Sequence, residues 1–404
     1  MYTPQLVWWL MIYQRLDDRG TLEAAVEQVV RGEPASLLNG CKRVREASVS
    51  PNNSRYCRAR NEMPKPMAED VSDVLNGGLK KRHVQCFPAL AGPVYLMDGS
   101  SVAMEATEAI REIYPPGENQ RGNSHWSVMR VVVAHDVLSG LALKPAYGPM
   151  YGEHAVSEQG LAEQVLGQLP KGSTIIEDRN FGTFAMVYGA QQHGHNVVAR
   201  LTGQRAQCLL GGNPRCGERR VAWRPSKSDR KAHPHLPAAA CVEGRILVSR
   251  LPGRNRGLLV LFTTLELPAD QVRELYGLRW NVETDLRSIK RTLNMYRLTS
   301  RRPEMAEKEL LAAICAYNLV RTVMCLAAES AGVKVRELSF TRALGLFQAF
   351  LPDIVAARTD ADAKAILRRL ARLIGTCKLP RRKRRRSFPR AAWSRRNKFP
   401  PRKK

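Results

Sequence analysis

Apolar positions change their spacing along the chain in blocks, and each block predicts a different kind of element. Up to about residue 90, apolar residues recur at helical intervals, as at Leu22, Ala25, Val26 and Val29. After Pro93 the pattern changes to short apolar runs that predict strands, with one amphipathic stretch among them. These segments are strands at 94–97, 128–134, 141–145 and 174–176 and a helix at 158–169. Strands and helices mixed in this order indicate an α/β core.

The second half of the chain divides into a β-rich part and a helical part. Between residues 186 and 264, short apolar pieces are separated by Gly, Pro and basic loops, which predicts an inserted β region. After Pro268, which suits a first helical turn, helical spacing continues to about Leu373. Breaks in it are expected near Pro303, Gly332 and Pro352.

Basic residues far outnumber acidic ones. The chain has 64 Lys and Arg against 37 Asp and Glu, a formal net charge of +27. Fourteen of the basic residues lie in the segment 378–404, which contains no acid. Such a segment repels itself and suits neutralisation of phosphates or of an anionic surface, although many basic tails are only solvated ends. The charge therefore predicts a polyanionic partner.

Composition also limits the compartment in which the chain works. The apolar run 6–13 is too short to span a membrane, and the longer run 310–328 is interrupted by Asn318 and Arg321, so it predicts a buried helix. Nine cysteines without a C-x-x-C pair argue against a disulfide framework and a standard zinc module. We therefore expect a cytoplasmic protein with no membrane partner.

Two of the predicted strands end on an acid. Asp98 directly follows the run 94–97, and Asp178 follows the run 174–176 and Glu177. A carboxylate at the end of a buried strand is costly unless it is paired, hydrogen-bonded or bound to a metal. Asp also ends strands and caps helices for structural reasons alone, so each position taken singly has two interpretations.

A third acid, Glu283, lies in a stretch with two neighbouring stripes at helical spacing. A buried face is predicted by Leu275, Leu278, Val282, Leu286, Ile289 and Leu293. Beside it, Glu283 shares one side of a single predicted helix with Tyr276, Arg279 and Lys290, because intervals of 3, 4 and 7 residues return to nearly the same angle. The alternative for this side is a solvated, salt-bridged surface.

Three carboxylates without a thiol or a regular set of histidines suit hard cations such as Mg²⁺ or Mn²⁺. Two such ions roughly 4 Å apart activate a water or a 3′-hydroxyl and stabilise the leaving oxygen when a phosphodiester is cleaved. A basic chain that also carries an acidic metal site therefore predicts a nuclease or a transferase acting on nucleic acid.

The segment from Tyr276 to Lys290 matches Y-x2-R-x3-E-x6-K at all four positions and resembles the signature of DDE transposases of the insertion-sequence-4 family. Other blocks resemble further parts of the same family. They are Met97-Asp98-Gly99-Ser100-Ser101, Asp178-Arg179-Asn180-Phe181-Gly182 and Ala316-Tyr317-Asn318-Leu319-Val320-Arg321. The resemblance therefore covers most of the chain.

The resemblance implies an RNase H-like catalytic core, a mixed sheet with flanking helices, interrupted by a β-strand insertion. It implies an enzyme that binds the inverted-repeat ends of an insertion sequence, cuts the donor DNA and joins its 3′-hydroxyls to target DNA, in a cut-and-paste reaction. Carried over to this chain, the catalytic and metal-binding residues are Asp98, Asp178 and Glu283, which hold two Mg²⁺ or Mn²⁺ ions. The implied DNA contacts are Tyr276, Arg279, Trp280, Arg287 and Lys290.

These implied contacts differ in kind. Arg279 suits a bidentate contact with phosphate, whereas Lys290 acts as a point charge. Trp280 resembles an aromatic position that helps to hold a displaced base, and its alternative is core packing. The implied partners are double-stranded DNA, both element ends and target, and a second copy of the chain in a homodimeric synaptic complex. The implied location is the bacterial cytoplasm at the nucleoid.

The blocks and the resemblance together predict six segments. They are an N-terminal helical DNA-binding domain at 1–90, the first part of the catalytic core at 91–185, a β-rich insertion at 186–264, the second part of the core with the signature helix at 265–330, a C-terminal helical region at 331–377 and a basic tail at 378–404. Relatives often have more sequence before the equivalent of Tyr2, so we expect this chain to lack an upstream portion of the end-binding domain.

Two other functions remain open from the sequence. A transposase-derived DNA-binding protein without catalytic activity would have the same charge, although the presence of all three acids counts against a decayed site. A ribosomal or other RNA-binding protein would also account for the net charge of +27, but it would have no purpose for aligned carboxylates. Basic residues of the N-terminal block, such as Arg55, Arg58 and Arg60, are expected either to contact phosphates or to form a solvated surface.

Overall fold

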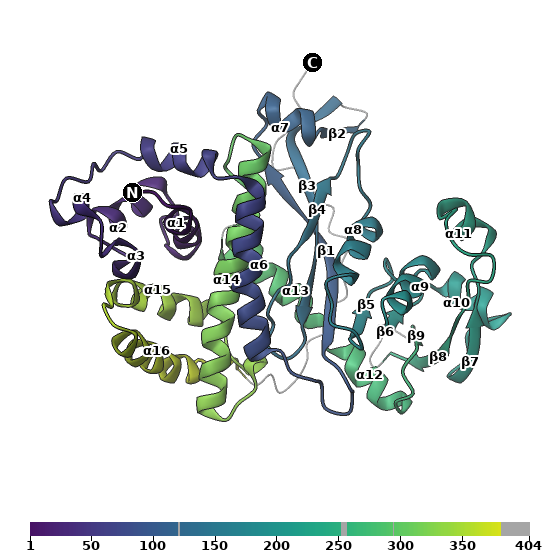
Figure 1. Cartoon of the computed structure of the whole chain (residues 1–404). Helices are drawn as coiled ribbons and strands as arrows, with labels where there is room; N and C mark the ends of the chain where they lie inside the picture. The colour runs from purple at the N-terminus through teal and green to yellow at the C-terminus, as the bar shows by residue number, and fades with distance from the viewer. Residues whose placement is uncertain (120–121, 252–256, 294, 381–404) are drawn as a thin grey trace, which may run out of the picture.

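The computed structural model describes residues 1–119, 122–251, 257–293 and 295–380. Its centre is a nine-stranded mixed sheet in the order β2-β3-β1-β5-β6-β9-β8-β7, with β4 paired to β3 (Figure 1). The strands are β1 (Val94–Met104), β2 (Pro116–Asn119), β3 (Gly122–Asp136), β4 (Ala146–Pro149), β5 (Thr174–Glu177), β6 (Asn196–Arg200), β7 (Gly217–Trp223), β8 (Val242–Arg250) and β9 (Leu258–Thr263).

Strand direction divides this sheet into two parts. β1 runs antiparallel to β3 and parallel to β5, and β5 runs parallel to β6. β9, β8 and β7 then continue the same sheet as an antiparallel meander from the edge of β6. Three antiparallel strands followed by two parallel ones form an RNase H-like core, so the predicted mixed α/β fold is confirmed.

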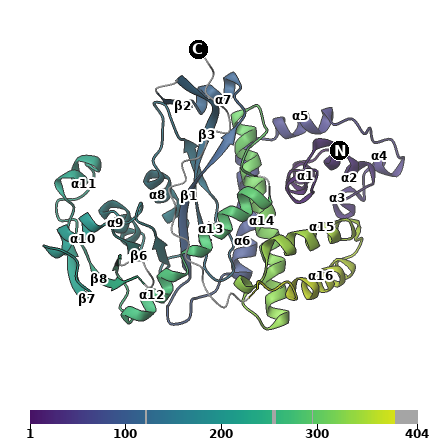
Figure 2. The same ribbon diagram turned by 180° about the vertical axis from the view of Figure 1, so that it is seen from behind.

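Helices cover both faces of the core strands. Alternate residues of β1, such as Tyr95 and Met97, pack against α8 (Glu158–Leu166) and α9 (Phe184–Gln192) on one face. The other alternate set, which includes Leu96, packs against α12 (Ala269–Gly277) and α13 (Trp280–Arg287). α12 and α13 cross the face of the parallel strands (Figure 2). The short helices α7 (Glu108–Ile113), α10 (Gly203–Leu210) and α11 (Lys227–Ala232) lie in connections between strands.

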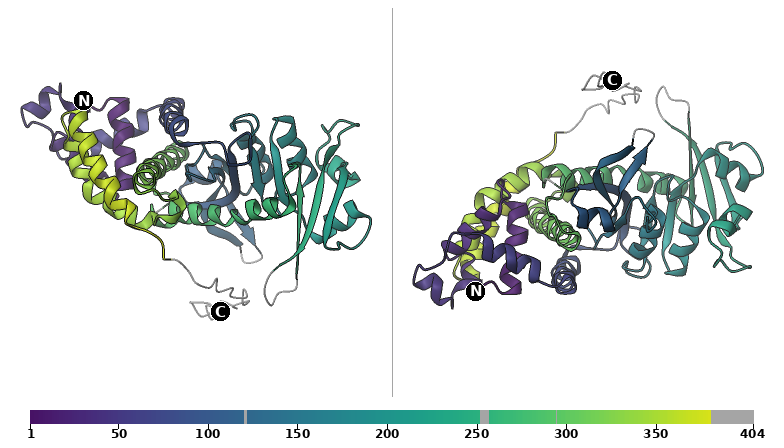
Figure 3. Two further views of the ribbon diagram at one scale, coloured as in Figure 1. Left: turned by 90° about the horizontal axis from the view of Figure 1, so that it is seen from below. Right: turned by 90° about the horizontal axis from the view of Figure 1, so that it is seen from above.

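A second layer of helices forms one end of the elongated molecule, and β7, β8 and β9 form the other (Figure 3). Its N-terminal members are α1 (Pro4–Leu16), α2 (Leu22–Val30), α3 (Ala35–Leu38), α4 (Lys42–Arg45), α5 (Ser54–Glu62) and α6 (Lys65–His83). Its C-terminal members are α14 (Pro303–Ala331), the 3₁₀ turn Val335–Glu337, α15 (Phe340–Ala356) and α16 (Asp360–Gly375). The two sets share one hydrophobic core.

α14 is the axis of that shared core. Pro303 suits its first turn, and Gly332 closes it in the left-handed conformation at φ +61°. α14 is the one described helix with the length and apolar character to cross a membrane, but 78% of its apolar window is buried inside the fold. The predicted buried helix at 310–328 is thus the middle of a longer core helix.

Several predicted elements differ from the structure. The strand expected at 141–145 lies instead at β4, and within 141–145 the described backbone forms only a bridge from Ala142 to His135. Pro352 does not end its helix, because α15 continues to Ala356. β6 pairs with β5 inside the core, so we propose that the insertion begins after Arg200 rather than at residue 186. Most of the basic tail, residues 381–404, lies outside the described residues.

A buried ionic network joins the sheet to the helices at Asp285, which is fully buried on α13. Arg336 donates to both carboxylate oxygens of Asp285 at 2.7 Å, and Arg321 of α14 also pairs with it. Arg336 donates in addition to the backbone carbonyls of Asp136 and Val137, at the end of β3. The network therefore fixes α13 to both β3 and α14.

His135 of β3 lies in the same network and predicts a pH dependence of stability. Burial lowers the pKa of His135 from 6.5 to about 4, despite Asp285 nearby. Because the unfolded chain binds this proton more readily, stability is fully present above pH 6.5 and falls as the pH drops towards 4. We expect His135 to contribute a loss of about 2 kcal/mol between pH 7 and pH 5. Urea unfolding across this range should show a shallower pH dependence in His135→Gln; an unchanged slope would contradict the assignment.

Candidate active site

Strand register places Asp98 and Asp178 at one level on neighbouring parallel strands. Leu96 of β1 pairs with Ile176 of β5, and each aspartate lies two residues further along its strand direction. Because side chains alternate across a strand, both aspartates belong to the face that carries Leu96 and Ile176, beneath α12 and α13. Asp178 directly follows β5, as predicted, whereas Asp98 lies inside β1, which continues to Met104 instead of ending at residue 97. The pairing of β1 with β5 brings the two acids together.

The signature residues do not lie on a single helix, in contrast to the prediction. α12 ends at Gly277. The backbone after it forms hydrogen bonds of the 3₁₀ type, from Leu278 N to Leu275 O at 3.1 Å and from Arg279 N to Tyr276 O at 3.0 Å. α13 then starts at Trp280, and a π-helical turn, Ser288–Thr292, carries Lys290. A glycine and two changes of helical pitch thus replace the regular helix expected from the spacing.

Two adjoining hollows nevertheless gather these side chains. The first, of about 270 Å³, is lined by Asp98, Asp178, Arg179, Arg200, Tyr276, Arg279, Trp280 and Glu283. The second, of about 460 Å³, is lined by Asp98, Glu283, Leu286, Arg287, Lys290 and Tyr296. Asp98 and Glu283 line both, so the carboxylates lie where the two hollows meet. We call the two hollows together the acidic groove.

Arg279 lies among the carboxylates. Its guanidinium donates to Glu283 at 2.9 Å and approaches Asp98 to 4.0 Å. The neighbouring Trp280 side chain is 60% exposed, so it is not a core residue, and the guanidinium of Arg279 lies 5.8 Å from its ring centroid. Arg279 thus pairs with Glu283 and lies close to Asp98, while its side chain stays partly exposed to solvent.

The surroundings of Asp98 disfavour its ionised form. Burial raises the pKa of Asp98 to about 6, the amide of Gly99 opposes the rise, and the charge of Asp178 adds to it. Asp178 is itself fixed by a tight turn, in which its Oδ1 accepts from the amides of Asn180 at 2.7 Å and Phe181 at 3.4 Å. A bound cation would relieve the repulsion between the two aspartates.

A fourth acid, Glu158 at the start of α8, was missed by the sequence analysis. Its carboxylate accepts from the side chain of Asn180 and lies against the backbone of Gly99, where a Cβ would come within 2.7 Å of it. Glu158 therefore contacts the residue after Asp98 and the second residue after Asp178. In the sequence, Ser157-Glu158 resembles an ordinary helix start, since acids are common in a first turn.

The remaining predicted DNA contacts lie around the same groove. Lys290 donates to Ser100 at 3.2 Å, two residues beyond Asp98 on the same side of β1. Arg287 is exposed, and Tyr276 is 8% exposed at the base of the first hollow. Arg179 and Arg200 add two cations that the sequence analysis did not select; Arg200 ends β6, next to the strand that leads to Asp178.

Oxygen donors alone form the acidic part of the groove, which fits Mg²⁺ or Mn²⁺ better than softer metals. Within the described ranges, no three His, Cys, Asp or Glu side chains lie close enough together to surround one ion. Asp98 and Glu283 are instead both within 4.0 Å of the Arg279 guanidinium. The residues therefore fit a divalent ion in kind.

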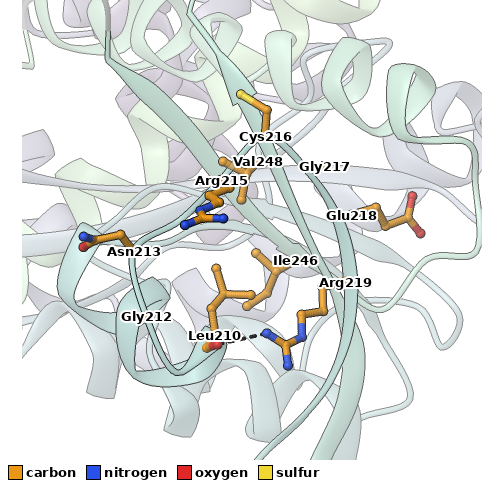
Figure 4. Close-up of a pocket in the computed structure, with 10 residues that line it drawn as sticks. All are labelled: Leu210, Gly212, Asn213, Arg215, Cys216, Gly217, Glu218, Arg219, Ile246 and Val248. Carbon is orange, nitrogen blue, oxygen red and sulfur yellow. Dashed lines mark hydrogen bonds between the residues drawn. The ribbon is translucent and has the colours of Figure 1, made fainter.

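Two other places are less suited to chemistry. A hollow of about 450 Å³ in the β-rich part is lined by β7, β8 and the loop after α10, and its single acid, Glu218, pairs with Arg245 at 2.7 Å (Figure 4). In the N-terminal block, Arg60 donates to Gln14 and pairs with Glu309, so its side chain belongs to the packing of the fold and not to a solvated surface.

Comparison with known proteins agrees with this geometry. Residues 90–319, which contain all three carboxylates and the signature, match the transposase DDE domain family. The chain is also 30% identical over 295 residues to the transposase InsG for insertion sequence element IS4 of Escherichia coli strain K12. The match covers 70% of this chain and 64% of that relative. The chain therefore belongs to the transposase DDE domain family.

Proposed function

We propose that this chain is a DNA transposase that cleaves element ends and transfers their 3′-hydroxyls to target DNA with the help of divalent ions. The observation that supports this most strongly is the acidic groove, where Asp98, Asp178 and Glu283 come from three separate elements to one place. Arginines and Lys290 surround these acids. Such a combination suits cleavage of a phosphodiester, because cations around the phosphate stabilise its negative charge in the transition state.

Asp98, Asp178 and Glu283 are the proposed ligands of two Mg²⁺ or Mn²⁺ ions. When bound, such ions lower the pKa of a water or hydroxyl nucleophile and stabilise the leaving oxygen. The chain's own part is to hold Asp98 on β1, Asp178 at the end of β5 and Glu283 on α13. The Asp285 network locks α13 in place. In the first step water attacks the phosphodiester at the end of the element and frees its 3′-hydroxyl. This 3′-hydroxyl then attacks a phosphodiester of the target DNA.

Arg279 is the residue proposed to change partners during binding. It pairs with Glu283 and approaches Asp98 in the structure, where it partly neutralises the acids. A guanidinium pairs bidentately with phosphate as well as with carboxylate, so a DNA phosphate can replace the acids as its partner. We propose that Arg279 moves to the phosphate, as Tyr276, Arg287 and Lys290 contact neighbouring phosphates, and that Trp280 stacks on a displaced base.

Other parts of the chain have proposed roles in assembly. Helices of residues 1–90 and the basic tail from 378 are expected to bind the inverted repeats and the target duplex, and two copies of the chain are expected to pair the two ends. These contacts would place the protein at the nucleoid of a bacterial cytoplasm. The domain boundaries given above remain predictions, apart from the proposed start of the insertion after Arg200.

Removal of the metal ion tests the proposed activity. We expect a plasmid that carries the coding region with its flanking repeats to be nicked in Mg²⁺, to remain intact in EDTA, and to be nicked again when Mn²⁺ is added. Gel shifts in EDTA should still show binding to DNA. Binding to DNA without cleavage in either metal would support the inactive DNA-binding alternative, and tighter binding to RNA would support the RNA-binding one.

A further inference from the structure

A second exposed aromatic side chain borders the acidic groove. Tyr296 is 62% exposed and lines the second hollow with Lys290, Arg287 and the carboxylates Asp98 and Glu283. Trp280, which is 60% exposed, lines the first hollow with the same two carboxylates. The acids that would bind the metal ions therefore lie between two solvent-facing rings.

Tyr296 is exposed although the backbone on either side of it is held firmly. Its carbonyl accepts from the amide of Ala103 at 3.3 Å, and the amide of Leu298 donates to the carbonyl of Ala103 at 2.8 Å, so this segment is attached to β1. Met295 and Leu298 are fully buried. An exposed aromatic ring on an anchored backbone segment loses little conformational entropy when a ligand binds to it.

The next residue strengthens the anchor. Arg297 pairs with Glu105 of the connection after β1, and its guanidinium lies 4.2 Å from the ring centroid of Trp126 on β3. The side chains of residues 295, 297 and 298 thus all contribute to the fold, whereas Tyr296 contributes its ring to the surface of the groove. The packing of the fold does not account for the identity of the side chain at this position.

Cations and an aromatic ring on one wall suit an unpaired strand. Lys290 and Arg287 supply charge for phosphates, and a ring of this size matches the face of a nucleobase, as in grooves that bind single-stranded nucleic acid. Building on the proposed function, we propose that Tyr296 stacks on an unpaired base of the DNA strand on the Lys290 side of the carboxylates. Bases would then be held on both sides of the reacting phosphodiester, by Trp280 and by Tyr296.

Paired changes in the protein and in the DNA test this stacking. The probe is a forked duplex with an unpaired arm, bound to the full chain in EDTA so that it stays intact. We expect Tyr296→Ala to weaken binding roughly tenfold and Tyr296→Phe to bind nearly as well as the natural chain, because the ring is retained. One abasic substitution in the unpaired arm should weaken binding by the natural chain. The same substitution should not weaken binding by Tyr296→Ala any further, because that variant has no ring to stack on the missing base.

Controls separate this proposal from the proposed function. Tyr151→Ala removes another exposed tyrosine, one outside both hollows as the structure describes them, and should bind like the natural chain. Equal loss in Tyr296→Phe and Tyr296→Ala would show a hydroxyl contact and overturn stacking. Unchanged binding in Tyr296→Ala, with cleavage intact, would overturn it too and leave the transposase function standing. Absence of DNA binding by the natural chain would instead contradict the function itself.

Discussion

Asp98→Asn is expected to reduce strand cleavage by about 10³-fold or more, a loss of roughly 4 kcal/mol of transition-state stabilisation. Asparagine keeps the size and one oxygen of the side chain but removes the charge that would hold a divalent ion. The same change should make the metal-free fold more stable. Because burial raises the pKa of Asp98 to about 6, its ionised form opposes folding at pH 7, by on the order of 1–3 kcal/mol.

The opposite signs of these two effects make the result easy to interpret. Plasmid nicking measures the loss of activity, and thermal unfolding without metal measures the gain in stability. Asp178→Asn and Glu283→Gln should lose activity as well, with DNA binding in EDTA retained. Asp353→Asn, at an exposed acid on α15, should change neither. Full cleavage by Asp98→Asn would show that this residue is not a metal ligand.

Asp285→Asn should be the most destabilising of the substitutions considered, with a cost of about 3–5 kcal/mol. Burial alone would raise the pKa of Asp285, but Arg336 and Arg321 outweigh it and hold that pKa below its ordinary value. Removal of the acid leaves these two guanidiniums inside the fold without a compensating charge. Urea unfolding at pH 7 measures the effect, and a loss of cleavage should accompany it because α13 also carries Glu283.

An exposed pair provides the matched control. Glu266→Gln removes the charge that pairs with Arg220, where both side chains are largely in solvent, and should cost less than about 1 kcal/mol. Its second neighbour, Arg245, lies at 4.0 Å and keeps its closer partner Glu218 at 2.7 Å. Replacing Arg336 by Met together with Asp285→Asn should recover part of the lost stability, since one of the uncompensated charges is then removed. If Asp285→Asn and Glu266→Gln had equal effects, the network could not be what fixes α13.

The fold was predictable wherever one periodicity continued long enough. The α/β core, the helical first block and the long helix around 310–328 all follow from apolar spacing, and the structure contains each. The expected strand at 141–145 was wrong because apolar character alone does not show which residues pair: β3 pairs with 146–149 instead. Pro352 lies within α15, where tertiary packing outweighs the usual tendency of proline to end a helix.

Site residues were predictable where an acid directly follows a buried apolar run. Asp98 and Asp178 were selected on this ground, and strand pairing places them side by side. The predicted strand end is correct for Asp178 but wrong for Asp98, because β1 continues to Met104. The sequence did not predict Glu158, Asp285 or Tyr296 as site residues. Their neighbours in space come from distant segments, and their local sequence has an ordinary structural explanation. The break between α12 and α13 was also missed, although Gly277 was a signal for it.

The shared core of α1, α6 and α14 has a consequence during biosynthesis. α1 lies roughly 290 residues before α14 in the chain, yet the two helices pack together. At a synthesis rate of about 5–20 residues per second, the apolar side of α1 waits tens of seconds on the ribosome for its partner. Until then the nascent chain exposes a surface that chaperones and proteases recognise. A message truncated before α14 would therefore yield a product that the cell degrades, even though all three carboxylates had already been translated.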